Sequence, residues 1–449
     1  MQRLQRRAYQ ERAARDAYSS TRRKVLVVSP GGSGKTIIIA RIVQLARKQK
    51  KTVLIISHRR EIVVQTKKLL ARLKEKPAIL MSTETTANGP MPVTIASVAT
   101  IMSRGIPEAD VLIIDECHRS AAKTYLKVVR RFDRDKKRII GLSATPHRLD
   151  GQAMGNIFDR MIEAAKPSDL LGKYIAKPIM VSGDPKQLPE LDKTDWKTGK
   201  DYNTVDLAAL VTKDGLIGDI VHEAKKRLGR RRAILFAVSV KHSKLLTKRL
   251  KMAGFKAVHV DGGMKTADRD KIRDDFEKGK YQILCNCELL NEGWDMPTCD
   301  AVIMCRPTRS ETLYLQQAAR CMRTGGKYKR PLIQDHAWMY ASFGDPDKDR
   351  DWSLKGTGLL PPKKFNPISM CPKGHLNPAS ATKCRVCGVK LSKKHRVLVP
   401  FERLAMRMKR MTKKRIAELK AWAEENGKGP AWLKEELAKP SVTAFVSSV

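Results

Sequence analysis

The chain has 449 residues, of which 42% are hydrophobic and 30% are charged, so it can bury the cores of roughly two to four domains. Lysine and arginine total 89 against 46 acidic residues, and the formal net charge of +43 predicts a polyanionic partner. The longest apolar runs are only as long as β-strands, and the arginine-rich N-terminus lacks the apolar region of a secretory signal. An odd count of nine cysteines argues against a closed disulfide framework. We therefore expect a cytoplasmic protein that binds nucleic acid and no membrane.

The first third of the chain alternates short apolar runs with amphipathic segments. Such continuous apolar strands, separated by helical periods, are typical of a parallel sheet covered by helices on both faces. Strands are expected at Val25–Val28, Thr52–Ser57, Val93–Ala96, Val111–Ile114 and Ile139–Leu142, and helices at Thr36–Lys48 and Arg60–Leu73.

The same alternation begins again after a polar stretch that contains Pro178, Pro185 and Pro189, where a connector and an irregular strand are expected. Strands are expected at Ala233–Ala237, Ala257–Val260, Gln282–Cys285, Ala301–Met304 and Leu332–Gln334, and helices at Val240–Met252, Thr266–Lys278 and Ser310–Met322. The two halves therefore look like two copies of one α/β architecture. Beyond Tyr340 the alternation stops, and 344–366 has the Asp, Lys, Pro and Gly content of a linker.

A glycine-rich loop lies between the first expected strand and the first expected helix. Its sequence, Ser29-Pro-Gly-Gly-Ser-Gly-Lys-Thr36, has the context of a nucleotide phosphate loop, although the strict pattern has glycine in place of Ser29. Glycines let backbone N–H groups turn towards a phosphate. Lys35 would reach the β- and γ-phosphates, and Thr36 would hold Mg²⁺ through its hydroxyl. The residues expected to bind ATP here are Gly31, Gly32, Ser33, Gly34, Lys35 and Thr36.

Two carboxylates follow the apolar strand Val111–Ile114. Side chains at the carboxyl end of a parallel strand point into the crevice where ligands bind. Asp115 can hold the Mg²⁺ shell, and Glu116 can orient and deprotonate the attacking water. Together with the phosphate loop, this pair predicts an NTP hydrolase.

Three cysteines and a histidine lie close together behind the second half. Four N/S ligands with no spare position predict a closed, structural Zn²⁺ site at Cys371, His375, Cys384 and Cys387. So short a segment cannot fold on an apolar core, and metal binding could supply roughly 10–16 kcal/mol. Unliganded cysteines in a loop are the alternative. The basic helical stretch that follows, Arg403–Arg415, would either contact phosphates or be a solvated face.

These motifs resemble, in their order, those of superfamily 2 helicases and translocases of the DEAD/DEAH type. Ser29–Thr36 resembles motif I, and Asp115–His118 resembles a DEAH motif II with Cys117 in place of alanine. Across residues 4–340, six further segments resemble the family's other motifs: Arg7–Gln10, His58–Gln65, Thr94–Ser97, Ser143–Thr145, Asn286–Asp295 and Arg306–Arg323. The resemblance implies two tandem RecA-like domains that hydrolyse ATP between them.

The resemblance also implies roles for individual residues. Gln10 would read the adenine edge, and Gly293 and Asp295 would complete the nucleotide site. Gln316 would act beside Arg320 and Arg323 in catalysis, and Ala319 stands where the family usually has glycine. Residues that would couple hydrolysis to domain movement are His118, Ser143 and Thr145. Residues that would contact the nucleic acid are Arg59, Arg60, Gln65, Thr94, Ser97, Thr308 and Ser310.

Two arginines in the second half are the candidates for charge neutralisation at the γ-phosphate. An arginine finger is worth roughly 10³ to 10⁵ in rate, and the first half offers no obvious arginine near its phosphate loop. Arg320 and Arg323, three residues apart near the end of an expected helix, would share one face. They can reach the nucleotide only if the second domain closes over the first. Surface salt bridges are their alternative role.

We expect five parts along the chain: a RecA-like ATP-binding domain (1–165), a RecA-like C-terminal domain (166–345), a linker (346–368), a zinc-binding module (369–392) and a basic helical tail (393–449). The motif wording is most similar to the DNA-acting branch of the family, which includes restriction-enzyme motor subunits, repair translocases and phage branch-migration helicases.

We therefore expect an ATP-dependent DNA helicase or translocase that uses ATP, Mg²⁺ and structural Zn²⁺ in the cytoplasm of a bacterial or phage-infected cell. RNA unwinding and a non-motor, zinc-bearing ATP switch stay open as alternatives, because phosphate contacts do not distinguish DNA from RNA. A nuclease or recombination partner would be a separate chain. The sequence leaves the oligomeric state open and is compatible with a monomer.

Overall fold

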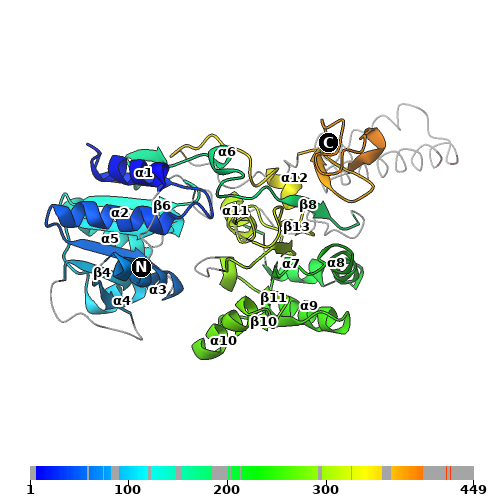
Figure 1. Ribbon diagram of the computed structural model, residues 1–449, viewed down its shortest axis with the longest axis horizontal. Coiled ribbons are helices and arrows are strands. Elements are labelled where there is room, and N and C mark those ends of the chain that lie inside the picture. The colour runs from blue at the N-terminus through cyan, green and yellow to red at the C-terminus, as the bar shows by residue number, and fades with distance from the viewer. Residues whose placement is uncertain are drawn as a thin grey trace.

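Two parallel β-sheets, each with helices on its faces, form the body of the protein, and a small antiparallel sheet follows them (Figure 1). The computed structural model describes residues 7–57, 60–73, 75–81, 91–119, 123–147, 154–184, 201–202, 204–212, 214–291, 296–324, 326–355 and 366–397, together with positions 421 and 425. The two sheets confirm the predicted α/β class with two tandem RecA-like domains. None of the helices in this part of the chain combines the length and the apolar character that a bilayer crossing needs.

The first sheet consists of β1 (Lys24–Val28), β2 (Val53–Ser57), β3 (Ala78–Leu80), β4 (Val93–Ser97), β5 (Val111–Asp115), β6 (Arg138–Ser143) and β7 (Arg160–Glu163), in the order β3-β4-β2-β5-β6-β1-β7. Its helices are α1 (Ala8–Tyr18), α2 (Lys35–Lys48), α3 (Arg60–Arg72), α4 (Val98–Arg104), η1 (Cys117–Arg119) and α5 (Lys123–Arg134). Alternate side chains of β1 point to opposite faces. Val25 and Val27 pack with α1, α2 and α3, whereas Leu26 and Val28 pack with α4 and α5. Burial on both faces explains why this strand is continuously apolar.

The second sheet consists of β8 (Ile179–Ser182), β9 (Ala233–Phe236), β10 (Ala257–Val260), β11 (Ile283–Asn286), β12 (Ala301–Met304) and β13 (Leu332–Asp335), in the order β10-β11-β9-β12-β13-β8. Its helices are α6 (Pro167–Leu170), α7 (Thr204–Val211), α8 (Asp214–Arg227), α9 (Val240–Met252), α10 (Thr266–Glu277), η3 (Leu289–Asn291), α11 (Glu311–Ala318) and α12 (Met339–Phe343). The stretch that was expected to hold a connector and an irregular strand contributes β8, a regular parallel strand at the sheet edge. α11 ends at Ala318, so Arg320 and Arg323 lie just beyond the helix and not within it.

Residues 344–355, which we name the return segment, cross from the second domain back to the first. They belong to the stretch that was expected to be a linker. Trp352 and Leu354 pack against the first domain's core, and the Leu354 carbonyl accepts a hydrogen bond of 2.9 Å from Gly155 N. On the second domain, the Arg350 guanidinium binds the carboxylate of Glu311, the first residue of α11. The described part of this stretch therefore contacts both domains. Although its composition is mostly polar, Trp352 and Leu354 attach it to the first domain's core.

A small sheet of β14 (Ile368–Met370), β15 (Leu376–Pro378) and β16 (Arg396–Val397), with η4 (Lys393–His395), forms the module that was expected to bind zinc. Val181 of β8 forms an antiparallel bridge with His375, and Arg227 Nη1 of α8 donates to the Lys373 carbonyl at 2.6 Å. Apolar side chains of the module join the core of the second domain: Ile368, Leu376 and Val397. The module therefore covers the edge strand β8. The expected basic tail lies, beyond Val397, outside the described residues apart from two helical positions.

Candidate nucleotide-binding and zinc sites

The phosphate loop connects β1 to α2, as the sequence predicted. Gly32 and Gly34 have φ values of 80° and 86°, which a side chain rarely permits, and Gly34 caps α2. The Ser29 and Ser33 hydroxyls lie 2.6 Å apart, and Ser33 Oγ donates to the Pro30 carbonyl at 2.6 Å. Ser29, which stands where the strict pattern has glycine, therefore forms a side-chain hydrogen bond across the base of the loop.

Gln10 holds this loop from outside. Its Nε2 donates to the Ser33 carbonyl at 2.8 Å, and its Oε1 accepts from Arg7 N at 3.1 Å. Tyr9 OH also donates to the Ser33 carbonyl. Only 3% of Gln10 is exposed, so both ends of its amide serve the loop and the start of α1 in this conformation. Its contact with adenine stays a prediction.

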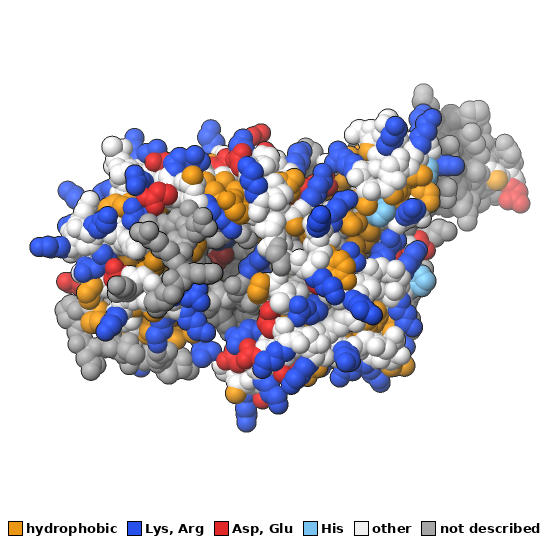
Figure 2. Space-filling view, in the orientation of Figure 1, with side chains coloured by type: hydrophobic (Ala, Val, Ile, Leu, Met, Phe, Trp, Pro, Cys, Tyr) orange, Lys and Arg blue, Asp and Glu red, His pale blue; other side chains and the backbone are white. Residues whose placement is uncertain are grey.

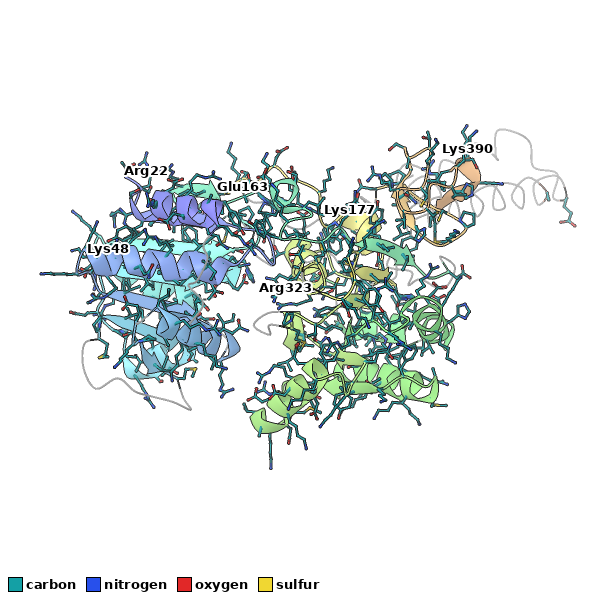
Figure 3. All side chains as sticks on the ribbon, viewed as in Figure 1. Arg22, Lys48, Glu163, Lys177, Arg323 and Lys390 are labelled. Carbon is teal, nitrogen blue, oxygen red and sulfur yellow. The ribbon has the colours of Figure 1, made fainter. Side chains whose placement is uncertain are left out.

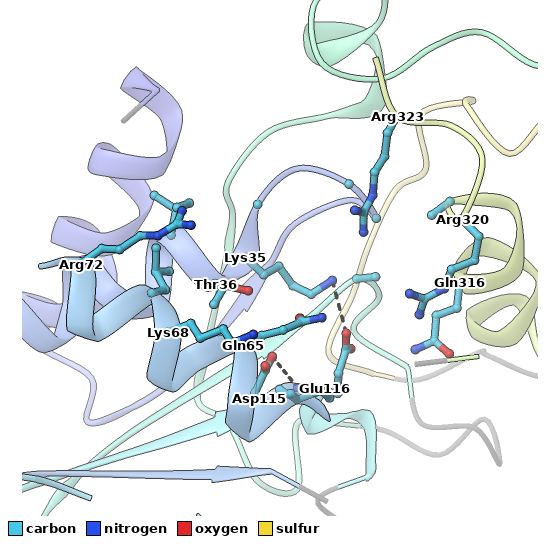
Figure 4. A pocket seen from close by; sticks show the side chains of 18 residues that line it. Lys35, Thr36, Gln65, Lys68, Arg72, Asp115, Glu116, Gln316, Arg320 and Arg323 are labelled. Carbon is cyan, nitrogen blue, oxygen red and sulfur yellow. Dashed lines mark hydrogen bonds and ion pairs between the residues drawn. The ribbon is translucent and has the colours of Figure 1, made fainter. Parts of the chain in front are cut away.

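A cavity of about 450 Å³ opens between the two domains, directly over the phosphate loop (Figure 4). The first domain contributes Gly31, Gly32, Gly34, Lys35, Thr36, Asp115 and Glu116, and the second contributes Gln316, Ala319, Arg320 and Arg323. Lys35 Nζ lies 3.5 Å from Glu116 Oε1, and the two arginines face this pair from the opposite wall. The structure thus brings the predicted catalytic residues of both halves to one space.

Three polar side chains of α3 line the cavity and were not predicted for this site. Gln65, Lys68 and Arg72 all line the cavity, although Gln65 was expected to contact nucleic acid. Their spacing along the helix places them on one face, which is the sequence signal that could have grouped them. The cavity lining contains five cationic side chains and the two carboxylates of Asp115 and Glu116. The cations are Lys35, Lys68, Arg72, Arg320 and Arg323. Such a lining favours a polyanionic ligand.

The two domains touch at the phosphate loop itself. A Cβ built on Gly31 would lie 2.3 Å from Ala319 Cβ, so only glycine fits there against this alanine. A Cβ on Gly32 would lie 3.6 Å from Arg323 Cγ. Burial lowers the pKa of the Arg323 guanidinium, while Glu277 nearby raises it. Since an arginine stays protonated even so, Arg323 presents a desolvated positive charge beside the loop.

His118 connects Glu116, the predicted catalytic carboxylate, to the second domain. Its Nδ1 lies 3.3 Å from Ser143 Oγ and 3.4 Å from Glu116 Oε2, and its Nε2 lies 3.4 Å from Gln316 Nε2. An amide nitrogen can only donate, so His118 Nε2 accepts and its Nδ1 carries the proton. The backbone of Glu116 has φ 49°, a strained value for a residue other than glycine, and the surrounding structure maintains it. Two of the predicted coupling residues thus meet at the catalytic carboxylate.

The third predicted coupling residue, Thr145, forms a direct contact between the domains. Its hydroxyl lies 2.7 Å from that of Thr312, which also donates to the His147 carbonyl at 3.3 Å. Thr312 is in the first turn of α11 and was missed by sequence reasoning, since a lone threonine in a helix carries no signal.

The oxygen atoms at the cavity fit a hard divalent cation. Thr36 at the start of α2 and Asp115 at the end of β5 both line the cavity, and Mg²⁺ prefers such hydroxyl and carboxylate oxygens together with phosphates. Asp115 Oδ1 is oriented by Glu116 N at 2.9 Å. Thr36 and Asp115 are therefore the residues that would hold Mg²⁺.

Most residues that were predicted to contact nucleic acid serve the fold in this conformation. Thr94 is buried within β4, and Ser97 caps α4 by accepting from Thr100 N. The Thr308 hydroxyl donates to Asp201 at 2.5 Å, and Ser310 caps α11. Arg60 pairs with Asp270 of α10 at 3.5 Å, across the two domains. Arg59 lies outside the described residues, as do Gly293 and Asp295, which were predicted for the nucleotide site. All of these contacts stay predictions.

The predicted zinc ligands converge in space. The ligand atoms of Cys371, His375, Cys384 and Cys387 all lie within 4.8 Å of one another. Cys371 Sγ is 3.8 Å from Cys387 Sγ and 3.4 Å from His375 Nδ1, and Cys384 Sγ is 3.7 Å from that nitrogen. A tetrahedral Zn²⁺ with ordinary bond lengths would separate two sulfurs by about 3.8 Å and a sulfur from a nitrogen by about 3.6 Å. The donor set and its geometry therefore fit Zn²⁺.

Comparison with known proteins agrees with this geometry. Residues 3–148 match the family model of the type III restriction enzyme res subunit, and residues 214–325 match the helicase conserved C-terminal domain. The chain is 32% identical over 369 residues to a 51.5 kDa protein of a Lactococcus phage, covering 81% of this chain and 77% of that protein. It is 28% identical over 343 residues to the putative ATP-dependent helicase IRC3 of Saccharomyces cerevisiae, covering 71% of this chain and 49% of that protein, about half its length.

A solved structure shows the same fold. The fragment of a putative HsdR subunit of a type I restriction enzyme from Vibrio vulnificus superposes with a TM-score of 0.57 at 18% identity, covering 76% of this chain and 66% of that one. At this identity the likeness concerns the fold alone.

Proposed function

Because the chain belongs to the superfamily 2 helicases and translocases, we propose that it is an ATP-driven motor that moves along DNA or unwinds it. One observation carries this proposal. Lys35 and Glu116 of the first domain share a cavity with Arg320 and Arg323 of the second, so hydrolysis needs both domains together.

The side chains of the cavity divide the work of phosphoryl transfer. Lys35 binds the β- and γ-phosphates, and Glu116 orients the attacking water and takes its proton. Arg320 and Arg323 stabilise the charge that develops on the transferred phosphoryl group. Mg²⁺, held by Thr36 and Asp115, supplies further positive charge at the phosphates when it is bound. The remaining cations, Lys68 and Arg72, attract the nucleotide.

The contacts between the domains turn hydrolysis into movement. In the closed state Ala319 packs on Gly31, and Gln316 reaches His118 beside Glu116. ATP favours this state because its phosphates bind groups from both domains, and their release removes that preference. If each domain grips the nucleic acid, alternate closing and opening produces steps along it.

Two observations favour DNA as the polymer on which the motor acts. The first domain matches a family named for a restriction-enzyme subunit, and the motif wording is that of the DNA-acting branch. In this proposal the motor works in the cytoplasm of a bacterial or phage-infected cell, any nuclease or recombination partner is a separate chain, and the zinc is structural.

The test compares polymers under one set of conditions. Steady-state ATPase rates are measured without nucleic acid and with single-stranded DNA, duplex DNA, branched DNA or RNA, at fixed salt. We expect DNA to raise the rate at least tenfold. Stimulation by RNA alone would make the protein an RNA helicase, and unstimulated turnover with every polymer would identify a non-motor ATP switch.

A further inference from the structure

The zinc-binding module carries an unusual charge for its size. The described segment 366–397 contains no acidic residue and no Phe, Tyr or Trp, and its seven lysine and arginine side chains are all exposed: Lys373, Lys383, Arg385, Lys390, Lys393, Lys394 and Arg396. Figure 2 shows lysine and arginine side chains gathered over this end of the molecule, and Figure 3 labels Lys390 at its outer edge. So one-sided a charge needs an anion from elsewhere.

Two of these lysines lie where they repel each other. Lys383 and Lys390 are direct partners in an antiparallel bridge, and like charges in that position destabilise a sheet. Lys393 and Lys394 follow in η4, only a few residues along the chain. Among the residues that the structure describes, the module's ion pairs involve Arg385 with Asp345, at 2.9 Å, and none of these four lysines. An anion bound between Lys383 and Lys390 would relieve this repulsion.

The module holds these charges in a fixed position on the second domain. The bridge from Val181 to His375 and the hydrogen bond from Arg227 to the Lys373 carbonyl fasten it to β8 and α8. The patch therefore moves with the second domain when the cleft opens and closes. A contact made there would act as a grip outside the cleft.

We propose that the basic patch formed by Lys383, Lys390, Lys393 and Lys394 binds the phosphate backbone of the nucleic acid on which the motor acts. The inference rests on the proposed function for the identity of the polymer. The module has no Phe, Tyr or Trp on which bases could stack, and the patch consists of lysines, so its contact is with phosphates and is independent of sequence. It adds a nucleic-acid contact that moves with the second domain.

The test removes the patch and compares it with an equal loss of charge elsewhere. The first variant carries Lys383→Ala, Lys390→Ala, Lys393→Ala and Lys394→Ala. The control carries alanine at four exposed lysines on α9: Lys241, Lys244, Lys248 and Lys251. Affinity for a fluorescent DNA duplex is measured by anisotropy at several salt concentrations, and bound zinc is measured by mass spectrometry.

Each lost phosphate contact lowers the slope of log K against log salt by about 0.9. We expect the patch variant to lose about 2 to 4 in slope and to bind at least tenfold more weakly, with its zinc and its DNA-free ATPase rate retained. A second variant, Lys390→Ala with Lys393→Ala, should lose about half as much, and the α9 control should lose less than 1.

The outcomes separate the two proposals. If the patch variant keeps the slope and affinity of the α9 control while the wild type shows DNA-stimulated ATPase, this inference is wrong and the motor stands. If the wild type neither binds nucleic acid nor responds to it, both proposals fail.

Discussion

The hydroxyl groups of Thr145 and Thr312 lie 2.7 Å apart and join the first domain to the helix that leads to Arg320 and Arg323, the predicted catalytic arginines. Both side chains are buried, with exposures of 0% and 1%. Thr312 also donates to the His147 carbonyl, so Thr145 is the donor to Thr312. The position of α11 is thereby linked to Thr145, which lies two residues beyond Ser143, the last residue of β6 and the partner of His118.

Replacing Thr312 by valine should weaken the closed state. The variant keeps the shape of the side chain but leaves the Thr145 hydroxyl buried without its acceptor, which costs about 1–3 kcal/mol. We expect the DNA-stimulated ATPase rate to fall about tenfold. Thr145→Val should be milder, because Thr312 keeps the His147 carbonyl as its acceptor. The double variant should recover part of the loss, and additive effects of the two changes would contradict the contact.

Gly31→Ala should block closure, and Ala319→Gly should rescue it. Gly31 does not have a positive φ, so alanine suits its backbone, but the new Cβ would lie 2.3 Å from Ala319 Cβ. We expect Gly31→Ala to reduce ATP turnover at least tenfold with little change in thermal stability. The double variant should restore most of the activity, since Ala319→Gly removes the colliding atom. Equal activity of the single and double variants would show that this contact does not limit closure.

Substitutions of the two cavity arginines, and of Lys35 or Glu116, should all reduce ATP turnover, but to different extents. Arg323→Ala and Arg320→Ala should lower kcat by about 10³ to 10⁵, because the charge on the transferred phosphoryl group loses its partner. Lys35→Ala and Glu116→Gln should abolish turnover while DNA binding is retained. The exposed Arg230→Ala serves as the control for lost charge. Hydrolysis that survives in Lys35→Ala or Glu116→Gln would remove the assignment of the cavity.

Zinc removal should destabilise the second domain as well as the module. One zinc per chain is expected, and Cys384→Ser should lose it. Since Ile368, Leu376 and Val397 pack in the second domain's core, loss of the metal should lower the melting temperature of that domain by several degrees. Cys287→Ser, at a half-buried cysteine outside the cluster, is the control. A purified wild type that contains no zinc would refute the site.

Stability should fall in acid partly because of His242. Burial lowers the pKa of His242 from 6.5 to about 4, and its Nδ1 accepts from Val238 N at 3.4 Å, which requires the neutral ring. A base with a depressed pKa stabilises the fold above its unfolded pKa, and this contribution is lost as pH falls from 6.5 towards 4. At pH 5 the loss is about 2 kcal/mol.

His242→Asn keeps an acceptor without the titration, so the difference in urea midpoint between pH 7 and pH 5 should shrink. The same substitution at exposed His222 is the control. An unchanged pH response in His242→Asn would rule out this source of acid sensitivity.

Local sequence was enough to predict the strands and the chemistry attached to them. The strand β1 is apolar because both of its faces are buried, and the loop behind it needs glycine because Gly32 and Gly34 have positive φ. The spacing of Cys384 and Cys387 is likewise a local property, since one metal must be reached from one tight turn. Signals of this kind depend on residues that are near in sequence.

Contacts between distant segments were decided only by the tertiary structure. Nothing in its composition distinguished the return segment from a linker, because Trp352 and Leu354 find their partners some two hundred residues earlier in the chain. Gln65 lines the cavity between the domains because α3 lies beside α2, and Thr312 meets Thr145 because the two domains pack against each other. A one-dimensional pattern records which face of an element is apolar, but which other element covers that face depends on how both domains pack in three dimensions.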